Sequence, residues 1–142
     1  MSLPENYFQL ITLELERVEE MCGKASTPEE MLYYFSAAYG IINRVMNFHC
    51  EPSLVFMHEV LQAAHQAFQN RLSSPRNPNS ESFMGTPAEL IEKLMMYFRG
   101  LREAFEGKDE IAIWRALEKI SNLTYATTGN GFYLYQTGKL VP

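Results

Sequence analysis

Apolar residues recur along the first part of this chain three or four positions apart. A helix has 3.6 residues per turn, so this spacing gathers them on one face. The pattern predicts a helix over 4–22, with Ser2 as its cap, Glu5 reaching back to the Ser2 amide, and Gly23 as its stop. The apolar positions are Phe8, Ile11, Leu15, Val18 and Cys22.

A second predicted helix has apolar residues on two adjoining lines, so we expect contacts on two sides and a central position. It begins after Thr27, which caps it, with Pro28 where a missing N–H does no harm. It must end near 49–51, because Pro52 disfavours a helical residue before it. A third helix is predicted over 53–72.

The second half of the chain predicts a helical hairpin. A polar stretch over 73–85, rich in serine, asparagine and proline, predicts a long loop before the fourth helix. The fourth helix ends in a short turn that contains Asp109, which can cap a fifth helix. So short a turn makes these two helices antiparallel. The stretch 129–138 is either a strand or a glycine-interrupted continuation of the fifth helix.

These elements predict an all-α protein, with about five helices in a single antiparallel helical bundle domain over 1–142. A chain of 142 residues suits one domain, and its 46% of hydrophobic residues can form a core without disulfides.

Charge and composition narrow the classes of partner. The net charge is −5 and the 12 basic residues are scattered, so we expect no nucleic-acid binding. Polar residues interrupt the most apolar stretch, 31–48, so we expect no membrane span. Two cysteines and an acidic start without a secretory signal favour a cytoplasmic protein with free thiols.

Two groups of side chains are candidates for holding a metal. Glu16, Glu19 and Glu20 lie at positions i, i+3 and i+4, which gathers three carboxylates that can hold a hard cation. A solvated acidic face is the alternative. His58 and His65 lie two helical turns apart, about 10 Å along the axis, so another helix would have to supply ligands between them. Ordinary solvent-facing or hydrogen-bonded histidines are the favoured alternative. The sequence assigns no catalytic residue.

Three stretches between 54 and 138 carry a family resemblance: AHQAFQN at 64–70, LREAFEGKDEIAIWRALEKI at 101–120, and NLTYATTGNGF at 122–132. In this order they resemble the all-α nucleoside triphosphate pyrophosphohydrolases, the group that is MazG-like and phosphoribosyl-ATP-pyrophosphatase-like. The resemblance implies Mg²⁺-dependent release of pyrophosphate from a nucleoside triphosphate. It also implies a homodimer, because one half completes its bundle with a partner.

The magnesium ligands of that family are largely missing. The family holds Mg²⁺ with carboxylates on two successive helices, whereas 95–99 contains none and Arg115 stands where a glutamate is expected. The resemblance leaves Glu118 and Asn122 as ligands, with the three first-helix glutamates as the other possible source.

The function prediction is therefore a small cytoplasmic helical protein that resembles these enzymes, either active with Mg²⁺ or catalytically degenerate. We expect it to form a homo-oligomer. The alternative is a non-enzymatic helical module that binds a protein partner through its aromatic and methionine-rich surfaces.

Overall fold

The computed structural model describes residues 3–73 and 87–128 of the chain, and within these ranges it contains helices and no strands. The predicted all-α, five-helix bundle is confirmed. Most of 73–85 and all of 129–138 lie outside the described residues, so the helix-or-strand alternative there stays open. The helices are α1 (Glu5–Lys24), α2 (Pro28–Met46), α3 (Pro52–Ser73), α4 (Pro87–Glu106) and α5 (Glu110–Thr128).

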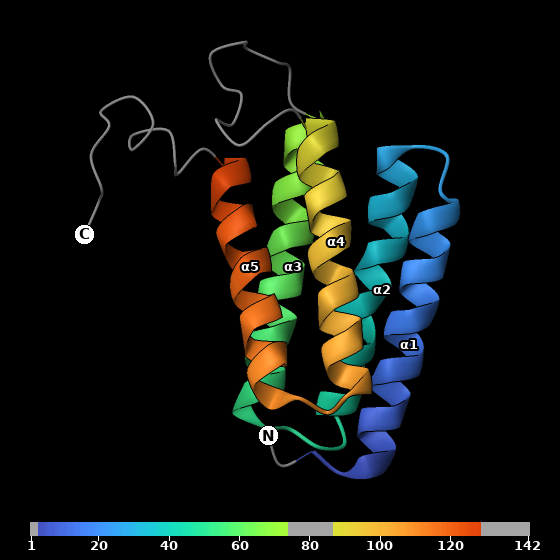
Figure 1. The fold of residues 1–142 in the computed structure, drawn as a ribbon, viewed down its shortest axis with the longest axis vertical. Helices are drawn as coiled ribbons and strands as arrows, with labels where there is room; N and C mark the ends of the chain where they lie inside the picture. Colours follow the sequence, from blue (N-terminus) through green and yellow to red (C-terminus); the bar gives the residue numbers. More distant parts are fainter. Residues whose placement is uncertain (1–2, 74–86, 129–142) are drawn as a thin grey trace, which may run out of the picture.

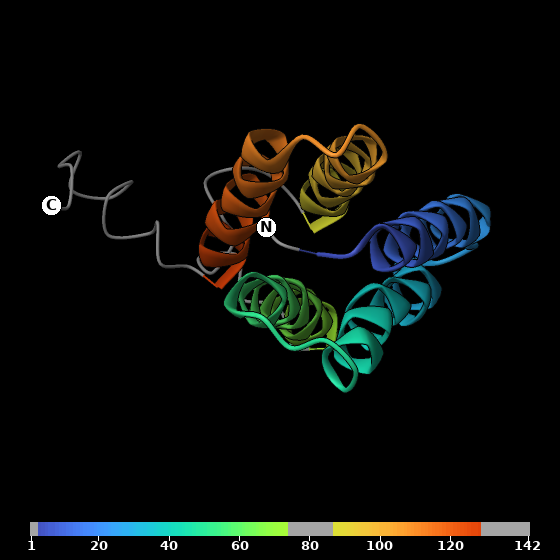
Figure 2. The ribbon, with the colours of Figure 1, turned by 90° about the horizontal axis from the view of Figure 1, so that it is seen from below.

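The helices form a closed ring in the order α1, α2, α3, α5, α4, which is visible when the bundle is viewed end-on (Figure 2). Consecutive helices run in opposite directions (Figure 1). In a ring with an odd number of helices, the helix directions cannot alternate at every step. One pair of neighbouring helices must therefore be parallel. That pair is α3 and α5, because α5 takes the place between α3 and α4. The predicted antiparallel packing therefore holds for the other neighbouring pairs.

One hydrophobic core fills the ring, and the predicted apolar stripes contribute many of its residues. The second helix, expected at a central position, is instead one helix of the ring, with α1 and α3 on its two sides. Phe35 of α2 meets Phe98 of α4 across the centre, with ring centroids 5.3 Å apart in an edge-on arrangement. On α1, every predicted stripe residue except Phe8 is buried, and Phe8 packs against the core from its rim. The fully buried large side chains include Phe35, Phe68, Phe98, Phe105, Ile11, Leu15, Leu32, Ile42, Leu54, Met57, Leu61 and Leu90.

The predicted caps of α2 and α5 are confirmed. The Glu30 backbone N–H donates a hydrogen bond to Thr27 Oγ1 at 3.1 Å, which satisfies one free amide of the α2 N-terminus. The Ala112 N–H donates to Asp109 Oδ1, also at 3.1 Å, at the start of α5. Both caps fix where a helix begins, so they hold the α4–α5 hairpin and the α1–α2 turn in place.

The predicted ends of α1 and α2 need correction. Ser2 lies outside the described residues, and α1 begins at Glu5 with Pro4 as its N-cap, a residue without a side-chain acceptor. The helix also continues through Gly23 until Ala25 takes an extended conformation. Likewise α2 ends at Met46, before the predicted 49–51, because a turn follows it directly.

Candidate ligand-binding groove between α4 and α5

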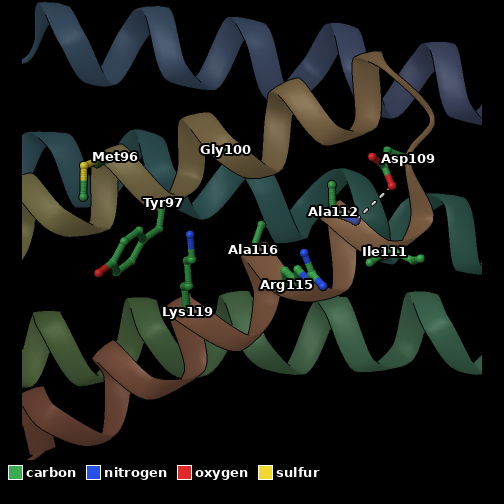
Figure 3. Close-up of a pocket in the computed structure, with 9 residues that line it drawn as sticks. All are labelled: Met96, Tyr97, Gly100, Asp109, Ile111, Ala112, Arg115, Ala116 and Lys119. Carbon is green, nitrogen blue, oxygen red and sulfur yellow. Dashed lines mark hydrogen bonds between the residues drawn. The ribbon is translucent and has the colours of Figure 1, made fainter.

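A groove of about 580 Å³ lies between α4 and α5, a volume typical of small-molecule sites. Gly100, Ala112 and Ala116 are three of its lining residues, and their small side chains leave the space between the two helices open (Figure 3). The other lining residues are Met96, Tyr97, Asp109, Ile111, Arg115 and Lys119.

Two cations on α5 line this groove. Arg115 and Lys119 are one helical turn apart, so they share the face of α5 that looks toward α4 (Figure 3). Among the described residues, neither forms an ion pair, whereas Arg17, Arg99 and Arg102 all pair with carboxylates. The groove is lined by these two cations and by one carboxylate, so it carries a net positive charge in a chain with a net charge of −5.

Tyr97 supplies an aromatic face next to these charges. The Lys119 ammonium nitrogen lies 5.9 Å from the centroid of the Tyr97 ring, within the range of a cation–π interaction. This contact ties α5 to α4 across the groove. It also places a cation and an aromatic ring side by side.

Asp109 is the carboxylate in the lining. Its Oδ1 accepts the Ala112 N–H at the start of α5, so the carboxylate is engaged at the turn end of the groove (Figure 3). The first amides of α5 add partial positive charge at the same end. The arrangement is suited to binding an anion.

The three predicted carboxylates of α1 have different surroundings. Glu19 accepts hydrogen bonds from Arg99 Nε at 2.8 Å and from Arg102 Nε at 2.7 Å. Burial alone would raise the pKa of Glu19, but the hydrogen bonds and positive charges of Arg102 and Arg99 outweigh it and lower the pKa. Glu20 pairs with Lys24 and Arg17, and Glu16 is exposed.

The two α5 candidates lie apart from this cluster. Glu118 and Asn122 are exposed on α5, which packs on α3 and α4, whereas α1 packs on α2 and α4. Among the described residues, no group of three or more histidine, cysteine, aspartate or glutamate side chains is arranged to hold a metal ion. Glu19 and Glu20 already pair with basic side chains, and Mg²⁺ ligation at the predicted positions stays a prediction.

Tyr39 of α2 is the side chain that reaches between the two predicted histidines. Its ring lies edge-on to His58 and His65, with centroid distances of 5.7 Å and 5.6 Å. The second helix that a metal site would need is therefore present, and it contributes an aromatic ring.

The sequence analysis did not predict the α4–α5 groove, although it expected Asp109 to cap the fifth helix. Arg115 drew notice only because it replaces an expected glutamate. The available signal was the i, i+4 spacing of Arg115 and Lys119 beside the i, i+4 spacing of Ala112 and Ala116. Gly100 could not be matched to them, because its position opposite the alanines depends on how α4 and α5 align.

No known family model, curated protein or solved structure matches this chain. In the part of the chain that the structure describes, the helices are too short or too polar to cross a membrane. The groove therefore has to be interpreted from its own chemistry.

Proposed function

We propose that this protein binds a phosphate-bearing ring compound of the nucleotide class in the α4–α5 groove and does not hydrolyse it. The observation that carries the proposal is the pair of cations, Arg115 and Lys119, which form no ion pair among the described residues and lie beside the ring of Tyr97. Arginine binds phosphate oxygens in a bidentate manner, and lysine binds them as a point charge. The aromatic ring provides a surface on which a base can stack.

This function fits a catalytically degenerate relative of the all-α nucleoside triphosphate pyrophosphohydrolases. The groove lies within 101–120, the longest stretch that carries the resemblance, together with 96–100 just before it. A metal-binding glutamate contacts the phosphate only through the metal ion. An arginine at the same position can contact the phosphate directly. Such a change supports binding while it removes a ligand that hydrolysis would need.

Calorimetric titration with ATP, and with inorganic tripolyphosphate, tests the binding in a buffer that contains EDTA. We expect Arg115→Gln and Lys119→Gln each to weaken binding of both ligands by about tenfold, since each loses a charge-assisted contact. Arg44→Gln is the matched control, because Arg44 is an exposed cation on α2, outside the groove. Equal affinities in all three variants would refute the site.

A pyrophosphate-release assay with Mg²⁺ and a panel of nucleoside triphosphates tests the absence of hydrolysis. We expect the wild-type protein to release no more pyrophosphate than a Glu118→Gln variant does. Release that is lost in Glu118→Gln or Glu16→Gln would show instead that the protein is an active enzyme and that the predicted carboxylates are its metal ligands.

A second candidate function, self-association, is favoured by one apolar patch. Phe56 of α3 and Trp114 of α5 lie against each other with ring centroids 5.1 Å apart, yet remain 43% and 37% exposed, and Ile111 beside them is 66% exposed. Exposed aromatic patches of this kind are typical of interfaces. The occupant we propose is a second copy of this chain, because the family resemblance implies a homodimer.

Light scattering coupled to size exclusion tests this candidate. Phe56→Glu should shift a dimer to monomer, whereas Leu13→Glu, at an exposed apolar position of α1, should not. A wild-type protein that is monomeric at every concentration would contradict it.

A further inference from the structure

A second pocket lies between α2 and α3, away from the α4–α5 groove. It measures about 500 Å³ and lies at the end of the bundle where α2 begins and α3 ends. Leu32, Tyr33 and Leu72 provide apolar surface, and Glu29, Tyr39 and His65 provide polar groups. Both helices contribute, so the pocket depends on the α2–α3 contact.

The polar groups of this pocket are held in place. The Tyr39 hydroxyl lies 3.3 Å from His65 Nδ1, and the two rings meet edge-on. Burial lowers the pKa of His65, against the opposing effect of its hydrogen bond with the Leu32 backbone, and burial raises the pKa of Tyr39. Near neutral pH both groups are therefore uncharged.

The charge of the lining comes from Glu29. It lies in the first turn of α2, where the helix dipole stabilises a carboxylate. Among the described residues, no lysine or arginine lines the pocket. The rings of Tyr33 and Tyr39 also line the pocket, and aromatic rings attract cations. This lining is opposite in charge to that of the α4–α5 groove.

We infer that the α2–α3 pocket binds a small organic cation, an amine or quaternary ammonium joined to an apolar body. The ammonium lies against the Glu29 carboxylate and the Tyr33 ring, a combination of charge and aromatic faces that recognises such groups. The apolar body lies against Leu32 and Leu72. An anion would meet the like charge of Glu29 in this lining. The inference is independent of the proposed function.

Titration with benzyltrimethylammonium, followed by amide chemical shifts, tests the inference. We expect saturable chemical-shift changes that are confined to the pocket. The neutral isostere, in which carbon replaces the nitrogen, should bind about tenfold more weakly. Benzoate, an anion of similar size, should produce no shifts there. Equal binding of the isostere, stronger binding of benzoate, or no saturable shifts with the cation would each overturn the inference.

Two glutamates in the same turn provide a matched pair of variants. Glu29→Gln should weaken binding of the cation by about tenfold. Glu30→Gln removes the same charge from a residue outside the lining, one that accepts a hydrogen bond from the Ser26 amide, and should leave the affinity unchanged. Equal effects of the two variants would overturn the inference. Glu29→Gln should also leave ATP binding unchanged. A result against the α2–α3 pocket is therefore distinguishable from a result against the α4–α5 site.

Discussion

Arg102 of α4 donates a hydrogen bond from Nε to the Glu19 carboxylate of α1 over 2.7 Å, although the two residues are 83 positions apart. The other Glu19 oxygen accepts from Arg99 at 2.8 Å. Arg102 and Glu19 are only 19% and 21% exposed, so solvent screens this pair less than an exposed one. The contact joins α1 to α4 and thereby closes the helical ring.

Replacing Glu19 with glutamine should therefore destabilise the fold. The variant keeps the size of the side chain but removes the charge that both arginines face, and we expect a loss of about 1–2 kcal/mol in the free energy of unfolding. Glu16→Gln, at an exposed position three residues away, should change it by less than about 0.5 kcal/mol. Urea denaturation of both variants measures the difference.

The same pair predicts an acid dependence. The pKa of Glu19 is lowered in the folded state from its ordinary value of 4.5, so the stabilisation is complete above pH 4.5. It is lost as the pH falls below that value through the folded pKa. The wild-type protein should lose more stability over this range than Glu19→Gln, and parallel curves for the two proteins would contradict the assignment.

His65 predicts a second pH dependence with a different origin. Its pKa lies below 6.5 in the folded state, chiefly because of burial, so the unfolded chain takes up the proton first. Stability should be full above pH 6.5 and should fall as the pH drops below 6.5 toward the folded pKa. His65→Gln should flatten this step in urea unfolding curves measured on both sides of pH 6.5, and an unchanged step would refute the role of His65.

Gly100 allows the α4–α5 groove to be filled without harm to the fold. An added Cβ at Gly100 or at Gly40 meets no atom within 4 Å, and both glycines lie inside helices. We expect alanine at either position to raise thermal stability, by about 0.5–1 kcal/mol. Only Gly100→Ala should weaken ATP binding, because only Gly100 lines the groove. Equal ATP affinities would show that the ligand lies elsewhere.

The two cysteines should differ in reactivity. Cys22 is buried, its Sγ lies 3.4 Å from the Met31 carbonyl oxygen, and burial together with the nearby Glu19 carboxylate raises its pKa to about 11. Cys50 is exposed. Iodoacetamide at pH 8 should label Cys50 in the native protein and Cys22 only after unfolding. Rapid labelling of native Cys50→Ser would contradict the burial of Cys22.

The helices were predictable because their signals are local. The apolar spacing on α1, the Thr27 cap and the Asp109 cap each involve residues within a few turns of one another. The order of the helices around the ring was not predictable, because it depends on α5 occupying the place between α3 and α4. Nothing near α3 in the sequence encodes that contact.

The candidate site was harder to predict for the same reason. The acidic spacing of Glu16, Glu19 and Glu20 suggested a metal, and the partners of Glu19 are arginines from a helix 80 or more positions away. Tyr97 and Lys119 meet only because the hairpin aligns α4 with α5. A single sequence gives the residues of such a site but not the alignment that brings them together.

Amide chemical-shift mapping during a titration with ATP tests the central claim most directly, because it locates the ligand. We predict that the shifted amides cluster on Gly100, Ala112, Arg115 and Lys119, and that the cluster disappears when Arg115 and Lys119 are both replaced by glutamine. Shifts that lie outside the α4–α5 groove, or that persist in this double variant, would contradict the account.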